Sequence, residues 1–592
     1  MATVPGRFLG YQEGHPQDPC QFRRLPDGTF APYTARQTAE RIWSLAGWLR
    51  QAGVQGGDRV VVLAATRPEW VHADLAIMAE GAVTVPIFPS LPADQVAYIC
   101  HDSGASLAVV QDEAARAKLP AGLPALVMDD AGWAEAAGAL PPTSADLAAW
   151  AADVERRVPE QSLATIVYTS GTTANSRGAM LTHGNLLGNA RSLDAAAQAS
   201  PGMAVGRDDR DLAFLPLSHI FERLVHLYFL THGVRIYYSD ARYLAEDMKV
   251  VRPTVLASVP RIYERIYAGV QAQATTPLRR RLFRSASRVA VRRGEALTGG
   301  RPESPGQRCA AVLYDRLVYA RIREALGGRL RYVISGGAAL SPELGRFFLG
   351  AGIPVCEGYG LTETSPVIAV NRPDDIRFGT VGRPLPGVEV RLAEDGEILC
   401  RGPNVMQGYW GRPEETAAAL AGGWFHTGDI GAWDGEGRLA VVDRKKAILV
   451  LSTGKKVVPA PIEQRLAASP LIEAAMLVGD GRKYLAALLV PDFQEVDRLA
   501  RQLGLTRSGA DALAVPAVRA AIDAEVRRLT APLADFERPK RWAALPRALS
   551  EEAGELTPSL KIKLRVVLDH FAADVAALYA ETSPGDRPAG SL

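Results

Sequence analysis

The stretch Ala164–Gly178 reads ATIVYTSGTTANSRG. Its first half is an apolar, β-branched run that predicts a buried strand, and its second half is a loop dense in glycines and hydroxyls. Small residues let the backbone approach a phosphate closely, and N–H groups and hydroxyls can donate to its oxygens. The stretch does not match the GxxxxGK[ST] pattern of a Walker loop. It therefore predicts a different phosphate-binding loop, with an ordinary Ser/Thr-rich turn as the alternative.

Short β-rich runs alternate with helical patterns on both sides of this stretch, up to about residue 380. An amphipathic helix is expected at Glu69–Glu80, between two of the runs. Such alternation is typical of α/β layers with largely parallel sheets. The strand candidates are Arg59–Ala64, Ala82–Ile87, Ser106–Gln111, Ala164–Thr169, Asp211–Leu215, Val234–Tyr238, Thr254–Ser258 and Arg331–Ile334.

The pattern changes towards the C-terminus. Beyond about residue 380 Gly and Pro become frequent and strand candidates short, which predicts a small β-rich subdomain. The last block looks α+β, with strands at Ala474–Val478 and Tyr484–Val490 and a helix at Ala517–Thr530. A polar, Pro- and Gly-rich tail predicts disorder. The expected domains are residues 1–442, residues 443–581 and a tail over 582–592.

Composition narrows the class of protein. The 592 residues carry a formal net charge of +2, and 47% are hydrophobic and 22% charged, which excludes disordered and fibrous proteins. Five scattered Cys without a CxxC pair argue against a disulfide framework and a structural zinc site. There is no secretory signal pattern and no run of 18 apolar residues. We expect a cytoplasmic enzyme that binds no nucleic acid.

Basic residues are unevenly divided, with 10 Lys against 57 Arg, and eight of the Lys lie at or after position 445. An Arg-preferring genome explains the imbalance and makes each Lys more informative. The segment 279–323 holds 12 Arg, no Lys and three acids, and Leu282, Ala286, Val289 and Ala290 share one helical face within it. This segment is either a solvated helical face or a basic amphipathic helix peripheral to the anionic inner face of a membrane.

Two further motifs point to a nucleotide. The octapeptide Glu357–Thr364, EGYGLTET, sets glycines around an aromatic ring that can lie flat against a base. It then offers a hydroxyl for phosphate and a carboxylate for Mg²⁺. Gly423–Asp429, GWFHTGD, ends in an Asp that can accept ribose hydroxyls, and Arg444 can donate to the same sugar. A β-turn Asp and a surface Arg are the alternatives for this last pair.

Together the motifs resemble those of the adenylate-forming superfamily of acyl-CoA synthetases, adenylation domains and luciferases, over nearly the whole chain. The closest likeness is to bacterial long-chain fatty acyl-CoA synthetases. It rests on the phrase His219–Arg223 (HIFER), the long insert before Ser335 and the ending Leu556–Lys563 (LTPSLKIK). The resemblance implies a large N-terminal domain of layered α/β subdomains with a small β-rich subdomain, followed by a mobile α+β C-terminal domain.

The resemblance also implies roles for individual residues. Residues expected to bind ATP and coenzyme A are Thr169, Ser170, Gly171, Thr172, Thr173, Arg177, Gly337, Ala338, Gly358, Tyr359, Gly360, Asp429, Arg444 and Gly454. Mg²⁺ is expected on Glu363 and Thr172. The residues expected to act in catalysis are Lys561, Glu363, Thr362 and His219.

Lys561 aligns with the essential C-terminal Lys of the family, where an ammonium would bridge the carboxylate and the α-phosphate as charge redistributes. Lys563, two residues on, is the runner-up. Asp443 stands at the family's hinge, and the resemblance implies that the small domain rotates between half-reactions. The rotation would present Lys561 for adenylation and the Ser452–Lys455 loop, with Gly454, for coenzyme A.

The implied reaction is fatty acid:CoA ligation. A fatty carboxylate attacks the α-phosphorus of ATP to give acyl-AMP and pyrophosphate, and the thiol of coenzyme A then displaces AMP. The alternatives are an acyl-AMP ligase, a ligase for an aryl or medium-chain acid, and an adenylate-binding protein without turnover. Acyl-chain length and oligomeric state stay open.

The phosphate loop departs from the family pattern, since Ala174, Ser176 and Arg177 stand where Gly, Pro and Lys are usual. Arg keeps the charge but is planar and forked. Ala adopts a left-handed backbone less easily than Gly. We expect these departures to alter the geometry of the loop without removing the activity.

Overall fold

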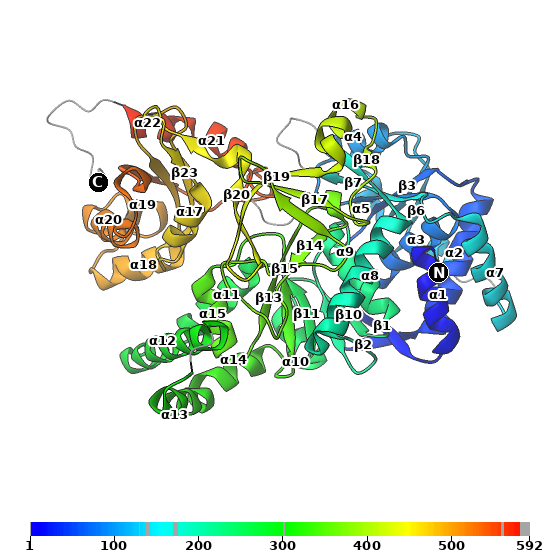
Figure 1. The fold of residues 1–592 in the computed structure, drawn as a ribbon, viewed down its shortest axis with the longest axis horizontal. Coiled ribbons are helices and arrows are strands. Elements are labelled where there is room, and N and C mark those ends of the chain that lie inside the picture. The colour runs from blue at the N-terminus through cyan, green and yellow to red at the C-terminus, as the bar shows by residue number, and fades with distance from the viewer. Residues whose placement is uncertain are drawn as a thin grey trace. The chain divides into compact units, whose positions relative to one another are not determined.

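The computed structural model describes residues 2–129, 131–137, 141–169, 176–299, 302–557 and 562–580. The chain divides into two compact units, both seen in Figure 1. Unit 1 is Met1–Ala393, Ile398–Thr427 and Trp433–Ala440, and unit 2 is Glu394–Glu397, Gly428–Ala432 and Val441–Leu592. The predicted boundary between residues 442 and 443 stays a prediction, and the predicted disordered tail 582–592 lies outside the described residues.

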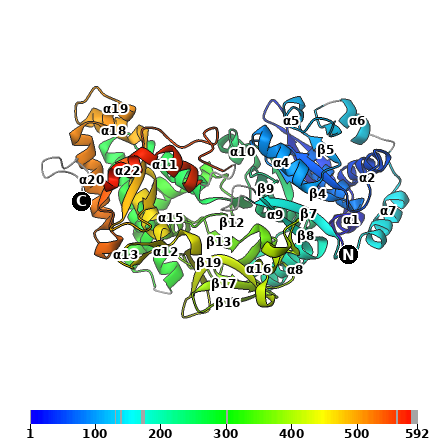
Figure 2. The ribbon, with the colours of Figure 1, turned by 90° about the horizontal axis from the view of Figure 1, so that it is seen from above.

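The largest sheet of unit 1 has the strand order β18-β8-β7-β4-β3-β5-β6. Its parallel strands are β7 (Leu163–Thr169), β4 (Val83–Ile87), β3 (Arg59–Leu63), β5 (Leu107–Val110) and β6 (Ala125–Val127). Helices α2 (Ala35–Gln51) and α4 (Ala93–Ser103) lie near it (Figure 2), and α3 (Pro68–Ala79) contacts its strands β3 and β4. Because both faces of such a sheet are covered, its strands are continuous apolar runs, as the sequence indicated.

Two antiparallel strands complete one edge of this sheet. β8 (Arg177–Thr182) returns antiparallel to β7, so that Thr169 pairs with Arg177. β18 (Gly408–Tyr409) then adds to β8 and pairs Tyr409 with Ala179. The edge therefore sets a late segment of the chain beside the stem of the predicted phosphate loop.

Unit 1 holds further sheets, and all eight strands predicted before residue 335 occur. One sheet has the order β2-β1-β10-β9 and another β11-β12-β13-β14-β15. The four-stranded sheet β16-β17-β19-β20 is the predicted β-rich part, and parts of β17, β19 and β20 belong to unit 2. Their bounds are β1 (Pro19–Arg24), β2 (Phe30–Thr34), β9 (Arg210–Ala213), β10 (Arg235–Tyr238), β11 (Val255–Ser258), β12 (Tyr332–Ser335), β13 (Val355–Gly360), β14 (Val367–Val370), β15 (Arg383–Pro384), β16 (Glu389–Leu392), β17 (Glu397–Arg401), β19 (Phe425–Trp433) and β20 (Leu439–Arg444).

Helix α3 corrects one expectation. The sequence predicted an amphipathic helix, yet every residue of α3 is buried, including Glu69, His72 and Asp74. The helix contacts strands β3 and β4 as well as α1 (Val4–Gly14) and α2, so no face is left for solvent. Its polar groups find partners instead, and His72 Nε2 lies 2.8 Å from Gln21 Oε1.

A buried ion pair joins three elements of unit 1. Arg223 of α9 (Ile220–Thr231) binds Asp74 of α3, with Nη2 to Oδ1 at 2.5 Å and Nε to Oδ2 at 2.9 Å. Its Nη1 donates to Thr165 Oγ1 of β7 at 2.7 Å. The two charged side chains are 1% and 0% exposed. The pair thus locks α9 and α3 to the strand that leads into the phosphate loop.

The Arg-rich segment forms helices, as expected. Ala286 and Ala290 of α12 (Pro277–Gly299) are buried. A Cβ on Gly350 of α15 (Pro342–Gly350) would lie 1.9 Å from the carbonyl oxygen of Ala290, so the two helices approach backbone to backbone. Other helices of unit 1 are α5 (Glu113–Arg116), α6 (Ala131–Ala137), α7 (Ser144–Arg157), α8 (His183–Ala199), α10 (Leu244–Val251), α11 (Pro260–Ala272), α13 (Pro305–Tyr314), α14 (Ala320–Ala325) and α16 (Pro413–Ala419).

Unit 2 is α+β, as expected. Its sheet β23-β24-β25 comprises Ile472–Val478, Ala486–Pro491 and Arg541–Ala544, and β21 (Leu449–Val450) and β22 (Lys456–Val457) form a separate hairpin. Alternate residues of the sheet pack into two cores, one with α17 (Pro459–Ala467) and α20 (Pro516–Thr530), the other with α21 (Leu564–His570) and α22 (Ala572–Tyr579). The remaining helices are α18 (Phe493–Gln502) and α19 (Gly509–Leu513).

A large α/β unit and a small α+β unit confirm the predicted fold class. Within the described parts of both units, no helix has the length and apolar character that crossing a bilayer requires.

Candidate active site

Strand pairing fixes both ends of the predicted phosphate loop. Thr169 ends β7 and faces Arg177 at the start of β8, and its Oγ1 donates to the carbonyl oxygen of Arg177 at 3.5 Å. The loop residues predicted to hold phosphate lie outside the described residues, and they are Ser170, Gly171, Thr172 and Thr173.

Arg177 lies in a group of charged and aromatic side chains. Its guanidinium carbon lies 4.3 Å from the centre of the Tyr409 ring, and Nη1 pairs with Glu415 Oε2 at 3.0 Å. Nε is buried and has no hydrogen-bond partner among the described residues. The guanidinium is therefore held in place by Tyr409 and Glu415, and its Nε is bound to none of the described residues.

Glu363 belongs to the same group. It is 7% exposed, and Tyr409 donates its phenolic hydroxyl to Oε1 at 2.8 Å. Burial, followed by the charge of Glu363, raises the pKa of Tyr409, so the phenol stays protonated and keeps donating. Thr362 is half-buried beside Glu363 in a short 3₁₀ turn, Thr362–Thr364.

Backbone contacts hold this turn in place. The N–H of Met406 donates to the carbonyl oxygen of Glu363 at 2.8 Å, and buried Asn404 donates from Nδ2 to the carbonyl oxygen of Thr364 at 3.0 Å. The segment that supplies Tyr409 therefore also positions Glu363.

Glu357 links the two segments predicted to hold the adenine. Gly337, with φ +82°, and Ala338 are exposed in the turn after β12. A few residues on, the N–H of Leu340 donates to Glu357 Oε1 of β13 at 2.9 Å. Burial raises the pKa of Glu357 to about 7, although this hydrogen bond opposes the shift.

The rest of the octapeptide lies at the end of β13. Gly358 and Tyr359 are half-buried, and Tyr359 pairs with Ala369 of the antiparallel neighbour β14. At Gly360 a Cβ would lie 1.6 Å from the carbonyl oxygen of Pro366. Only glycine permits this approach of two backbones.

His219 begins α9 and caps it, because its Nδ1 accepts the N–H of Phe221 at 3.2 Å. The ring of Phe221 packs on Gly336, where a Cβ would lie 3.1 Å from its Cζ. The phrase His219–Arg223 therefore meets the Gly336–Ala338 turn, and the structure brings these two predicted segments together. His219 itself is half-buried, with its ring near that of Phe88.

Unit 2 carries the remaining predicted residues that are described. Arg444 Nε lies 3.4 Å from Asp429 Oδ1, and Asp429 is buried while the Arg444 side chain is 65% exposed. Gly454 has φ +77° and no neighbouring atom where a Cβ would stand. Asp443 accepts the N–H of Arg444 at 2.6 Å and that of Ala460 at 3.1 Å. Lys561 lies outside the described residues.

Sequence reasoning missed two residues of the unit 1 site, Tyr409 and Asn404. It also missed that Glu357 links the two segments predicted to hold the adenine. Tyr409 follows a glycine in a strand of only two residues, which leaves no periodic signal. The sequence did offer a signal for the role of Glu357. It stands at the first position of the octapeptide, next to an apolar strand, and a buried carboxylate there needs a hydrogen-bond partner.

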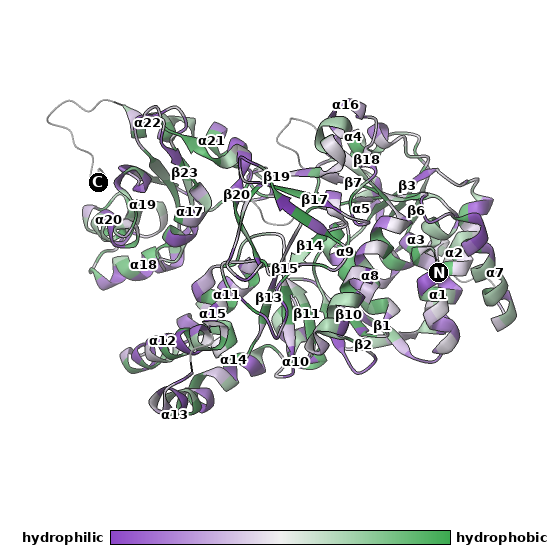
Figure 3. Ribbon diagram, viewed as in Figure 1, coloured by the Kyte–Doolittle hydropathy of each residue, from purple (hydrophilic) through white to green (hydrophobic). Residues whose placement is uncertain are grey.

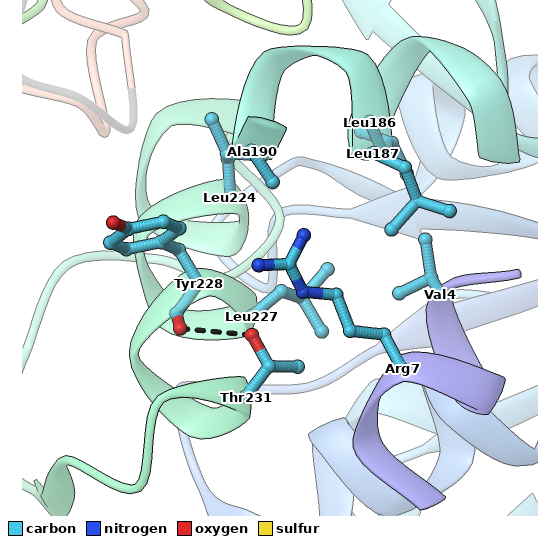
Figure 4. A pocket seen from close by; sticks show the side chains of 9 residues that line it. All are labelled: Val4, Arg7, Leu186, Leu187, Ala190, Leu224, Leu227, Tyr228 and Thr231. Carbon is cyan, nitrogen blue, oxygen red and sulfur yellow. Dashed lines mark hydrogen bonds between the residues drawn. The ribbon is translucent and has the colours of Figure 1, made fainter. Parts of the chain in front are cut away.

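A pocket of about 20 Å³ opens between α1, α8 and α9, away from these residues (Figure 4). Leucines from α8 and α9 line it together with Val4 and Arg7, and Arg7 is already paired with Asp194 at 2.7 Å. No predicted site residue lines this pocket, and its volume is below the roughly 300–1,000 Å³ of small-molecule sites. It is not the site of the chemistry.

Among the described residues, no three His, Cys, Asp or Glu side chains group closely enough to hold a metal ion.

Residues 12–410 match the AMP-binding enzyme family, and residues 446–583 match the AMP-binding enzyme C-terminal domain. The chain belongs to the AMP-binding enzyme family. The resemblance to the adenylate-forming superfamily is thereby confirmed.

Relatives of this AMP-binding enzyme align along most of its length. It is 38% identical over 570 residues to the long-chain-fatty-acid–CoA ligase FadD15 of Mycobacterium bovis, covering 94% of each chain. It is 32% identical to the long-chain-fatty-acid–CoA ligase 1 of Homo sapiens, covering 97% of this chain and 86% of that protein. The adenylation domain of a carboxylate reductase from Mycobacterium chelonae shares the fold, with a TM-score of 0.74 at 23% identity over 98% of this chain and 91% of that one.

Replacing Glu357 should change how stability depends on pH. Burial raises its pKa from 4.5 to about 7, so between these values the native state binds the proton more tightly than the unfolded chain does. The contribution of Glu357 to stability therefore falls as the pH rises through this range. In Glu357→Gln, which can still accept from Leu340, the free energy of unfolding should fall less from pH 5 to pH 8 than in the wild type.

Urea unfolding at the two pH values measures this difference. Glu324→Gln is the control, because Glu324 is an exposed glutamate of unit 1. Equal pH dependence in wild type and Glu357→Gln would contradict the assignment.

Proposed function

We propose that this AMP-binding enzyme is a long-chain fatty acid:CoA ligase of the AMP-forming type. The observation that carries the proposal is the near full-length similarity to relatives bearing that name, at 38% and 32% identity. The unit 1 site supports it, because Arg177, Tyr409 and Glu363 form a connected set beside the ends of the loop expected to hold phosphate. The substrates are then ATP, a fatty acid and coenzyme A.

The side chains of unit 1 suit the first half-reaction. In-line attack of a carboxylate on phosphorus needs positioning and positive charge more than a protein nucleophile. The guanidinium of Arg177, whose Nε has no hydrogen-bond partner among the described residues, would supply a donor for phosphate oxygens. Thr169 and the loop residues through Thr173 donate to the same group, while Gly337, Ala338 and Gly358–Gly360 accommodate the base. Thr362 would offer its hydroxyl to phosphate, and His219 would lie on the acyl side of the site.

Mg²⁺ is part of this proposal, and Glu363 with Thr172 would hold it. In sites where phosphates carry the metal, Mg²⁺ needs only one or two protein carboxylates. A single buried Glu363, fixed by Tyr409, fits that requirement. Mg²⁺ would supply charge neutralisation on the phosphates.

The residues of unit 2 take the remaining roles in the proposal. Asp429 and Arg444 would bind the ribose, and Gly454 would admit the pantetheine arm of coenzyme A. Residues 443–581 would move as one C-terminal domain between the two half-reactions and carry Lys561 to the reacting groups.

A substrate panel tests the function directly. With ATP, palmitate should drive ATP–pyrophosphate exchange, and added coenzyme A should give palmitoyl-CoA and AMP. Exchange without coenzyme A-dependent AMP release would favour an acyl-AMP ligase, and faster turnover of aryl or medium-chain acids would reassign the substrate. Absence of exchange with every acid would leave only the adenylate-binding protein.

Lys561→Ala should abolish adenylation, with a loss of at least about 100-fold, because it removes a charge aimed at the transition state. Thioester formation from supplied palmitoyl-AMP should continue. Lys563→Ala is the matched control and should retain both half-reactions. Equal loss of both half-reactions in Lys561→Ala would rule out the assigned role.

We further propose that the ligase works on the anionic inner face of a membrane through α12 and α13, called here the Arg-rich helix pair. These helices lie at the edge of unit 1 in Figure 1, and hydrophilic and hydrophobic residues intersperse along them in Figure 3. The solvent-facing side of α12 carries an exposed stripe at helical spacing, made of Arg281, Arg284, Arg288 and Arg292.

The acids of the segment compensate this stripe only in part. Glu303 pairs with Arg293 at 3.4 Å and Asp315 with Arg323 at 2.6 Å, away from the stripe. The third acid, Glu295, is exposed three residues beyond Arg292, so the four arginines of the stripe keep a net positive charge. Large apolar side chains stand in solvent on the same helices, with Leu278 78% and Val312 61% exposed. Positive charge interleaved with exposed apolar residues favours a lipid surface over a solvated face.

Reversing charge on the stripe should weaken membrane binding. Each basic residue near an anionic surface contributes about 1 kcal/mol, so Arg284→Glu/Arg288→Glu should reduce partitioning by at least roughly 30-fold. Sedimentation with vesicles containing phosphatidylglycerol measures it. Arg501→Glu/Arg507→Glu, exposed positions of unit 2, is the control with equal charge change. If both double variants bind as the wild type does, the surface is a solvated face.

A further inference from the structure

We propose that Asp102, Tyr98 and Tyr168 form a clamp that holds both stems of the phosphate loop and thereby sets the affinity for ATP. The inference rests on the proposed ligase function, which gives the loop its ligand. Asp102 and Tyr98 lie one turn apart on α4, and Tyr168 is the next-to-last residue of β7. The three are positioning residues that act through the loop.

The incoming stem is held through Tyr168. Its hydroxyl donates to Asp102 Oδ2 at 2.6 Å. Burial, followed by this hydrogen bond, raises the pKa of Tyr168, so the phenol remains a donor. A Cβ on Gly178, which pairs with Tyr168 across the stem, would lie 3.2 Å from the Tyr168 ring and 2.5 Å from Ile166 Cγ2. The ring thus packs closely against the returning strand at Gly178 and has little room to move.

The outgoing stem is held through Tyr98. Its hydroxyl lies 3.1 Å from the carbonyl oxygen of Ser176, the last residue before β8, and 3.4 Å from Asp102 Oδ1. Because a phenol has one proton, the shorter contact to Ser176 takes the donation. Arg412 Nη2 lies 3.4 Å from the Tyr98 oxygen and 3.5 Å from Asp102 Oδ1, and supplies the compensating charge.

The same helix end also binds the segment that carries Tyr409. Trp410 donates from Nε1 to the carbonyl oxygen of Asp102 at 3.1 Å, and its N–H donates to the carbonyl oxygen of Gly178 at 2.8 Å. Asp102 is therefore the point at which α4, both loop stems and the Tyr409 segment meet. A shift of this carboxylate would change the width of the loop and the position of Arg177 together.

Loss of one clamp contact should weaken ATP binding selectively. A single neutral hydrogen bond corresponds to about a two- to tenfold change, so Tyr98→Phe should raise the KM for ATP by that factor. Asp102→Asn, which disturbs contacts to both stems, should raise it further. The KM values for palmitate and coenzyme A should stay as in the wild type, as should thioester formation from supplied palmitoyl-AMP.

Tyr319→Phe is the matched control. Like half-buried Tyr98, buried Tyr319 of unit 1 donates its hydroxyl to a backbone carbonyl, that of Ala286 at 2.7 Å, but it lies on the Arg-rich side of the unit. This variant should keep the wild-type KM for ATP. A general loss of stability would lower both half-reactions alike, whereas the clamp predicts a change in adenylation alone.

Two outcomes would overturn the clamp. One is an unchanged KM for ATP in both Tyr98→Phe and Asp102→Asn, and the other is a parallel fall of adenylation and thioester formation. Failure of the proposed function would look different, because the wild type would then show no palmitate-driven exchange. In that case the affinity for ATP is measured by calorimetric titration. Equal affinity of the wild type, Tyr98→Phe and Asp102→Asn would overturn the clamp.

Discussion

The buried ion pair between Arg223 and Asp74 fixes the parts of unit 1 on which the candidate site depends. Removing one partner of such a pair typically costs about 3–5 kcal/mol, because the other charge stays buried without compensation. Arg223 also donates to Thr165 of β7. The strand that enters the phosphate loop and the helix that begins at His219 therefore share one guanidinium, so neither can shift without the other.

The arginine at position 177 has a structural partner of its own. Its planar group lies over the ring of Tyr409 and pairs with Glu415, whereas a lysine ammonium in its place would lack the forked, planar geometry. Tyr409 in turn donates to Glu363. The departure from the family's usual Lys, which genome composition alone could explain, thus fits a local arrangement that uses the shape of the guanidinium as well as its charge.

The central strands of unit 1 could be predicted because strands covered on both faces are short apolar runs between turns. The environment of α3 could not be predicted, since polar residues such as Glu69, His72 and Asp74 favour exposure when the helix is read alone. Two of them find their partners on Gln21 and Arg223, far away in the chain.

The motifs contain the predicted site residues themselves, and the structure brings Arg177 and Glu363 together through Tyr409. Tyr409 escaped because its place depends on pairing with β8, and a two-residue strand has no period. The clamp residues Tyr98 and Asp102 escaped for a different reason. Nothing in an amphipathic helix indicates which loop its last turn will contact.

The contact at Gly360 also constrains how the gene can change. The carbonyl oxygen of Pro366 occupies the space that any side chain would need. Every single-base change in a glycine codon that does not stop translation either keeps glycine or introduces a residue with a Cβ. No single-base change that replaces Gly360 can therefore keep the present backbone. A different residue could become established at position 360 only together with a rearranged β13–β14 turn.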